Sequence, residues 1–114
     1  MKIIVAHAAD TPIESAHGGT GSRRLYIDDK QSPSGNIQGM THGWLPAGEV
    51  FDWHTHEDIE EVMFVMKGSG IVADREGEYA YSPGTVVVFP ANVEHTVINN
   101  TQEEHEFMFV RIYE

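Results

Sequence analysis

The chain has 114 residues, 40% hydrophobic and 22% charged, which fits one globular domain over residues 1–114. The absence of cysteine excludes disulfides, thiolate metal sites and a cysteine nucleophile. A formal net charge of −11 makes nucleic acid and anionic membranes poor partners, because both would repel an acidic surface. No apolar run is long enough for a secretory signal or a membrane span, so we expect a cytoplasmic protein.

Short runs of β-branched and aromatic residues, separated by turns rich in Gly, Pro, Ser and Asn, predict strands rather than helices. Residues 1–22 carry no clear element, and we expect them to pack on the remaining fold or on a partner subunit. Many short strands at this spacing predict an all-β antiparallel sandwich or barrel. The expected strands are Arg24–Asp28, Ile37–Leu45, Val50–His56, Glu60–Met66, Ile71–Asp74, Tyr79–Tyr81, Thr85–Phe89, His95–Ile98 and Phe107–Tyr113.

Two of these strands are apolar on both faces. In Val62–Met66 and Phe107–Val110, successive residues point to opposite sides of the sheet, yet all are apolar. A sheet with one face in water would alternate apolar and polar residues. Either the N-terminal segment or a second subunit therefore covers the outer face. Because two-fold dimers are the commonest oligomers, we expect a homodimer.

A cluster of potential metal ligands lies in the middle of the chain. His54 and His56 are two residues apart, so on one strand their imidazoles share a face. Glu61 has the opposite parity, but the polar residues before it predict a bend that would place it on the neighbouring strand, about 4.8 Å away. Glu60 is the alternative carboxylate. Two imidazoles and one carboxylate suit Fe(II), Mn or Zn, and His95, which begins a later strand, is a candidate fourth ligand.

The spacing of these residues resembles the two motifs of the cupin superfamily. Residues 48–68 read Gly-x5-His-x-His-x4-Glu-x6-Gly, and residues 84–99 read Gly-x5-Pro-x-Asn-x2-His-x3-Asn. Asn92 stands where the family usually has glycine, and asparagine is the side chain that best tolerates a left-handed backbone. The resemblance implies a single conical β-barrel, a double-stranded β-helix or jelly roll, with turns at the motif glycines and Pro90. It also implies one divalent ion inside the mouth of the barrel, held by His54, His56, Glu61 and His95.

The side chains that would line a substrate pocket depend on which residues face inward. If even positions of the strand over residues 37–45 do so, Gln38, Met40, His42 and Trp44 line the cavity. Tyr79 and Tyr81 share a face and are further pocket candidates, with hairpin packing as the alternative. Met63 is a pocket candidate that also fits the core.

Other notable residues favour structural roles. Phe51 and Trp53 have the opposite parity to the histidines and are expected outside the barrel. Arginines are expected in outer-face salt bridges, with an anionic substrate as the alternative partner. These are Arg23, Arg24 and Arg111. Three histidines have no partner by spacing and are expected at the surface: His7, His17 and His105.

The resemblance implies a metal-dependent enzyme that acts on a small organic molecule. A dioxygenase-type oxidoreductase with Fe(II) is the first expectation, with Mn, Ni, Zn or Cu as other ions. A redox-neutral isomerase, cyclase or lyase, in which the metal acts as a Lewis acid, is the second. A non-catalytic module that binds a small molecule is the third.

Overall fold

The computed structural model describes residues 2–16 and 19–114, and nearly all the regular structure in them is β-strand. No helix in these ranges is both long and apolar enough to cross a membrane. A short 3-10 helix, η1 (Ala8–Asp10), precedes the strands. These are β1 (Glu14–Ser15), β2 (Ser22–Asp28), β3 (Ile37–Leu45), β4 (Val50–His54), β5 (Ile59–Lys67), β6 (Gly70–Ala73), β7 (Glu78–Tyr81), β8 (Val86–Phe89), β9 (His95–Ile98) and β10 (His105–Tyr113).

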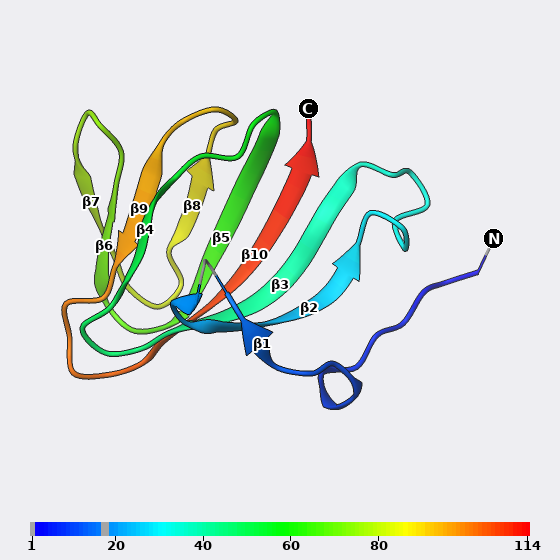
Figure 1. Cartoon of the computed structure of the whole chain (residues 1–114), viewed down its shortest axis with the longest axis horizontal. Coiled ribbons are helices and arrows are strands. Elements are labelled where there is room, and N and C mark those ends of the chain that lie inside the picture. The colour runs from blue at the N-terminus through cyan, green and yellow to red at the C-terminus, as the bar shows by residue number, and fades with distance from the viewer. Residues whose placement is uncertain (1, 17–18) are drawn as a thin grey trace.

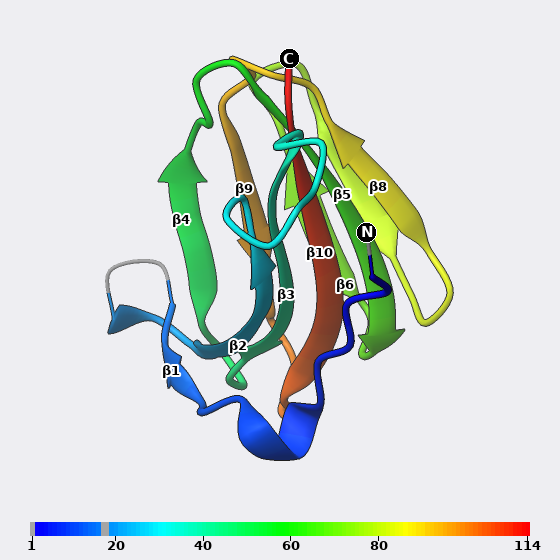
Figure 2. The ribbon, with the colours of Figure 1, turned by 90° about the vertical axis from the view of Figure 1, so that its right-hand side faces the viewer.

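The strands form two antiparallel sheets that enclose one hydrophobic core. A six-stranded sheet has the order β1-β2-β3-β10-β5-β8, and a four-stranded sheet has the order β4-β9-β6-β7 (Figure 1). Figure 2 shows β4 and β8 on opposite sides of the molecule, with β10 between them. The all-β prediction is confirmed, and the two facing sheets fit a jelly roll. β1 is the one strand of the described residues that lies outside the expected strands.

Alternation of buried and exposed residues defines the inner face of the six-stranded sheet. In β3 the odd-numbered residues from Gly39 onward are buried, and Leu45 is fully buried, whereas the even-numbered residues are only partly buried. The same parity holds in β10, where Phe107 is fully buried. The expected inward register of β3 is therefore wrong. Met40, His42 and Trp44 lie on the outer face of the sheet. Gln38 lies at a bulge in the β3–β10 pairing, and its side chain accepts a hydrogen bond from Arg111.

Phe51 also corrects a sequence expectation, because it lies in the core and not outside the barrel. Its side chain is 1% exposed. Phe51 pairs with Val97 and His54 pairs with His95, so three steps along β4 match two steps along β9. The extra residue is a β-bulge, which shifts the alternation by one. Phe51 and His54 can thus both face inward, although their numbers differ in parity.

His105 is fully buried, which contradicts its expected place at the surface. Its Nδ1 lies 2.7 Å from the hydroxyl of Tyr81, and its Nε2 lies 2.9 Å from the hydroxyl of Thr101. Burial lowers the pKa of His105 below its ordinary value. Gly68 packs against this ring: a Cβ built there would lie 2.0 Å from a ring carbon, and the backbone has φ +99°. Both observations require glycine at this position of the first motif.

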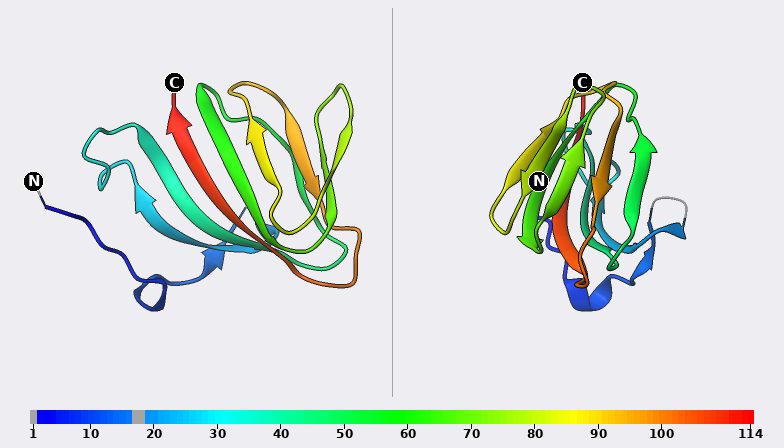
Figure 3. Two further views of the ribbon diagram at one scale, coloured as in Figure 1. Left: turned by 180° about the vertical axis from the view of Figure 1, so that it is seen from behind. Right: turned by 90° about the vertical axis from the view of Figure 1, so that its left-hand side faces the viewer.

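The N-terminal segment stands away from the two sheets. Figures 1 and 3 show residues before β1 leaving the body of the molecule beyond β2. Ile3 is 93% exposed and Val5 is 69% exposed. β1 itself pairs only with β2 in the described sheet. Of the histidines expected at the surface, His7 is exposed, and His17 lies outside the described residues.

Candidate metal centre

Four side chains from three strands and one loop converge between the two sheets. His54 ends β4, His56 follows in the next loop, Glu61 is the third residue of β5, and His95 begins β9. One ligand atom from each lies within 4.8 Å of the others. Oε1 of Glu61 is 3.7 Å from Nε2 of His56 and 3.6 Å from Nε2 of His95. Two atoms bound to one ion at about 2.1 Å are roughly 3.4 Å apart in a tetrahedral arrangement, so these separations suit a shared ion.

Backbone carbonyls orient two of the imidazoles. Nδ1 of His54 donates to the carbonyl of Asp52 at 2.6 Å, and Nδ1 of His95 donates to the carbonyl of Val93 at 2.9 Å. A neutral imidazole that carries its proton on Nδ1 has its lone pair on Nε2. Burial lowers the pKa of His54, although its bond to the Asp52 carbonyl acts in the opposite direction. The ring is therefore neutral at pH 7 and ready to bind a metal ion through Nε2.

Glu61 supplies the negative charge of the cluster. Its side chain is 4% exposed, and Glu60 beside it in β5 points to the opposite face. Burial alone would raise the pKa of Glu61, but the imidazoles of His56 and His95 and the guanidinium of Arg111 outweigh it and hold the pKa far below its ordinary value. The carboxylate is therefore ionised at pH 7, as a metal ligand must be.

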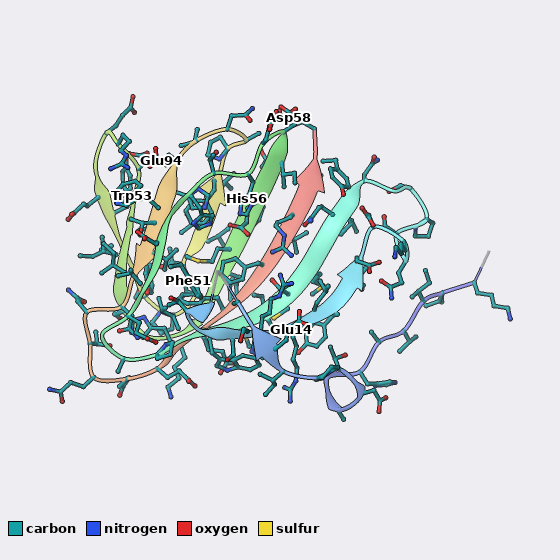
Figure 4. The ribbon with its side chains drawn as sticks, in the orientation of Figure 1. Glu14, Phe51, Trp53, His56, Asp58 and Glu94 are labelled. Carbon is teal, nitrogen blue, oxygen red and sulfur yellow. The ribbon has the colours of Figure 1, made fainter. Side chains whose placement is uncertain are left out.

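The loop that carries His56 is tied to the second motif by Asn92. Both Asn92 and Asp58 have left-handed backbones, with φ of 66° and 56°. The Asn92 backbone N–H donates to the His56 carbonyl at 3.1 Å, and its side-chain oxygen accepts the Asp58 N–H at 3.0 Å. The asparagine thus adopts the conformation that the family's glycine provides, and its amide adds bonds that glycine could not make. Figure 4 shows His56 and Asp58 toward the same rim of the molecule, with Phe51 deeper between the sheets.

The donor set fits a divalent ion. Nε2 of His56 and Nε2 of His95 are buried, and neither has a hydrogen-bond partner within the described ranges. An unsatisfied buried polar atom costs about 1–3 kcal/mol, and a cation bound by both atoms would remove that penalty. Three imidazoles and one carboxylate would hold this ion, and they suit first-row metals with positions left open for another ligand.

The cupin domain model matches residues 43–111 of the chain, a range that contains the whole cluster. This chain belongs to the cupin family. No protein of curated function matches it. The family predicted from the two motifs is therefore confirmed.

Several cupin structures superimpose on this one at low sequence identity. A predicted oxalate decarboxylase from Thermotoga maritima has a TM-score of 0.83 and 20% identity, over 97% of this chain and 100% of that chain. Ectoine synthase from P. lautus has a TM-score of 0.81 and 15% identity, over 97% of this chain and 78% of that chain. The polyketide cyclase RemF from Streptomyces resistomycificus has a TM-score of 0.79 and 17% identity, over 99% of this chain and 81% of that chain. At these identities the likeness establishes the fold, which hosts more than one chemistry.

Arg111 is an inner-face residue of this cupin, and the expectation of an outer-face salt bridge is wrong. Odd residues of β10 face inward, and Arg111 is 9% exposed. Its Nη1 lies 3.5 Å from Oε2 of Glu61 and 3.3 Å from the hydroxyl of Thr41. Its Nε donates to the side chain of Gln38 at 2.6 Å. Burial lowers the pKa of Arg111 while Glu61 acts to raise it. The guanidinium stays protonated at pH 7 because the ordinary pKa of arginine lies far above 7. Its step-of-two register with Phe107 and Phe109 in β10 is the signal that could have found this residue.

The other two arginines lie apart from the cluster. Arg23 pairs with Glu14 at 3.0 Å. Arg24 lies over the ring of Trp44, 5.6 Å from its centroid, and donates to the carbonyl of Thr11. These contacts agree with structural roles for both. Neither arginine makes a described contact with the four clustered side chains.

A mostly apolar cavity reaches the cluster at His95. It lies between β8 and the β6–β7 hairpin, and its lining includes Val72, Val87 and Tyr79. The ring of Phe89 stacks on His95 at a centroid distance of 4.0 Å. Tyr79, one of the pocket candidates, thus lies beside the cluster. A second hollow is lined by Trp53, His54 and His56. The guanidinium of Arg75 lies over the Trp53 ring, 3.6 Å from its centroid.

The remaining pocket candidates lie elsewhere in the cupin. Tyr81 and Met63 are buried in the hydrophobic core, at 2% and 0% exposure. Met40, His42 and Trp44 lie on the outer face of the six-stranded sheet, as described above. There His42 bonds with the carboxylate of Glu106 at 2.8 Å and with the hydroxyl of Tyr26 at 3.0 Å. None of these five residues lines the cavity at His95.

Proposed function

We propose that this cupin is a metal-dependent enzyme that acts on a small organic molecule. The observation that carries the proposal is the pair of buried, unsatisfied Nε2 atoms of His56 and His95, which face the carboxylate of Glu61. With His54, these side chains would hold one divalent ion. Such an ion would supply a Lewis acid and, as Fe(II), a redox centre for O2. The cavity at His95 would hold the substrate, because its mostly apolar walls exclude water and restrict orientation.

Oxidation with O2, as in a dioxygenase, is the first candidate reaction. Imidazole and carboxylate ligands with open positions are typical of non-haem Fe(II) oxygenases. Fe(II) is accordingly the first candidate ion. The protein's own contribution would be to fix the ligands and to keep bulk water out of the apolar cavity.

A redox-neutral reaction is the second candidate, and two structural neighbours favour it. These neighbours are described as a synthase and a cyclase. An isomerase, cyclase or lyase needs the ion only to polarise an oxygen of the substrate. Mn, Ni, Zn or Cu would then serve in place of Fe(II), since the same donor set accepts several of these ions.

Metal content tests the proposal directly. We expect one equivalent of a first-row metal per chain in the wild-type protein by elemental analysis. His95→Ala should lose it and keep its circular dichroism spectrum. His42→Ala is the matched control, because His42 also contacts a carboxylate but lies on the outer face. Full metal retention in His95→Ala would overturn the assignment.

Oxygen uptake separates the candidate reactions. The Fe(II)-loaded protein would be incubated with small keto and hydroxy acids in an oxygen electrode, and in parallel under anaerobic conditions with detection by NMR. Conversion that requires O2 supports the oxidation. Conversion without O2 supports the redox-neutral reaction, and binding without any conversion would instead indicate a non-catalytic binding module.

A further inference from the structure

The two oxygens of Glu61 face different partners. Oε1 lies beside the Nε2 atoms of His56 and His95, at 3.7 and 3.6 Å. Oε2 lies 3.5 Å from Nη1 of Arg111. Both charged side chains are almost fully buried, so solvent and salt screen their attraction only weakly. One oxygen is therefore directed at the candidate metal position and the other at a permanent cation.

Arg111 is fixed in this position by β3. Its Nε donates to Gln38 at 2.6 Å, and its Nη1 is 3.3 Å from the hydroxyl of Thr41. Gly39, between these two residues, leaves room for the guanidinium, since a Cβ built there would lie 2.6 Å from Nη2. A planar guanidinium held at two nitrogens has little freedom to turn. Contacts from β3 thus hold the Glu61–Arg111 pair in one arrangement on the inner face.

The pair changes the charge of the candidate centre. Three neutral imidazoles and one carboxylate would lower the charge of a divalent ion by one, but the guanidinium beside that carboxylate cancels its charge. The acidic residues nearest in sequence do not reverse this effect, because Asp52, Glu57, Asp58 and Glu94 are exposed to solvent and screened. Glu60 is half-buried, but it lies on the opposite face of β5.

We propose that Arg111 is a positioning residue that directs one oxygen of Glu61 to the ion and neutralises the carboxylate, so that the loaded centre takes an anionic oxygen ligand. This inference rests on the proposed function and names its substrate class: a small carboxylate or enolate. The anionic oxygen would bind the ion, and the rest of the molecule would lie along the apolar cavity at His95. The overall charge of the chain does not oppose such a ligand at close range, because local charges in a buried site outweigh distant screened ones.

Anion binding to the cobalt-loaded protein tests the inference without any substrate turnover. Co(II) replaces the native ion, and its visible absorption reports each added ligand. Azide and acetate serve as anionic probes and imidazole serves as a neutral probe. We expect Arg111→Gln to weaken azide and acetate binding at least about tenfold and to leave imidazole binding within about twofold. Arg111→Lys keeps the charge and should recover most of the azide affinity, although lysine lacks the two-nitrogen attachment.

The control is Arg24→Gln, which removes an arginine that lies over Trp44 on the outer face of the sheet, donates to the Thr11 carbonyl and does not contact Glu61. Azide affinity in this control should match the wild type. Unchanged azide affinity in an Arg111→Gln protein that holds one cobalt overturns the inference and leaves the metal site intact. A wild-type protein that binds no cobalt overturns the proposed function as well. If Arg111→Gln fails to fold, Gln38→Leu loosens the guanidinium instead: weaker azide binding supports the inference, and unchanged binding overturns it.

Discussion

The two faces of the six-stranded sheet are both rich in apolar side chains, yet they have different surroundings. The inner face packs Phe107 and Val65 against the core and carries the buried Glu61–Arg111 pair. The outer face carries apolar residues such as Phe64, together with the hydrogen-bonded chain Tyr26–His42–Glu106. Each face thus holds a small polar set among apolar neighbours. The difference lies in what covers them: the second sheet covers the inner face, and nothing within the described chain fully covers the outer one.

A matched pair of phenylalanines gives the largest expected difference between the faces. Phe107 is 0% exposed and Phe64 is 44% exposed, on neighbouring strands. Phe107→Ala should lower the free energy of unfolding by about 3–5 kcal/mol, as for other buried aromatic residues. Phe64→Ala should cost about 1 kcal/mol in a monomer. Guanidinium denaturation measures both, and equal losses would mean that the two faces are equally covered.

A matched pair of glutamates sharpens the comparison at the candidate centre. Glu61 and Glu60 are adjacent in β5 and point to opposite faces. Glu61→Gln should weaken metal binding at least about 100-fold, since it removes an anionic ligand, and Glu60→Gln should leave it within about twofold. Competition with a chromogenic chelator gives both affinities. A large loss in Glu60→Gln would move the ligand to the other face.

The uncovered outer face leads us to expect a dimer of two copies of this chain. Val86 and Val88 are 58% and 53% exposed on β8, next to Phe64. The N-terminal arm, residues 2–7, carries the exposed apolar residues Ile3, Ile4 and Val5, and Figures 1 and 3 show it standing off the sheet. Two copies could each place an arm over the other's outer face. Phe64→Glu and deletion of residues 2–7 should each weaken dimerisation about tenfold or more, by burying a charge or removing apolar contact.

Sedimentation velocity over a range of concentrations measures this effect. Val50→Glu is the matched control, because Val50 is an exposed apolar residue of β4 in the other sheet. It should leave the dimer intact. A wild-type protein that sediments as a monomer at all concentrations would contradict the prediction.

The smallest expected effect is a pH dependence that comes from buried histidines. Burial lowers the folded-state pKa of His54 and His105. Between that value and the unfolded pKa of about 6.5, the unfolded chain binds more protons, so stability falls as the pH decreases below about 6.5. The slope reaches at most about 1.4 kcal/mol per pH unit for each histidine. Urea denaturation of the metal-free protein between pH 7.5 and pH 5.5, as rough limits of the window, measures it.

Two variants test whether His105 contributes to that slope. His105→Gln removes one titrating group and should flatten the curve. Thr101→Val removes a hydrogen bond to the His105 ring and keeps the group, so it should lower stability by about 1 kcal/mol with less change in slope. A slope that is the same in His105→Gln and the wild type would show that His105 does not contribute.

Most of the fold and the four clustered residues could be predicted from the sequence, because turn residues punctuate the strands and fixed spacings define the two motifs. Which side chains of each strand face the core could not be predicted. In β3 the inner positions include the small residues Gly39, Thr41 and Gly43, whereas the larger Met40 and Trp44 lie on the outer face, so composition favours the wrong face. In β4, a bulge shifts the alternation by one residue. A bulge is a property of pairing between two strands, which a single sequence does not display.

The errors at Phe51, His105 and Arg111 came from treating each residue by itself. Each was assigned from its spacing or from its residue type, since phenylalanine beside a ligand strand, a lone histidine and an arginine all have common surface roles. The signal that could have found Arg111 is its register with Phe107 and Phe109 at steps of two in β10. That register is reliable there because the buried residues alternate without interruption over seven positions, from His105 to Arg111.

The carbonyl acceptors of His54 and His95 have one further consequence. Each lies two residues before its histidine, so the short stretch of backbone that carries the ring also chooses its tautomer. The nitrogen that faces the centre has no proton to give up when a cation arrives. Metal uptake by the neutral rings should therefore displace no proton from either of them. The heat of binding should then be insensitive to the ionisation enthalpy of the buffer, apart from any contribution of His56.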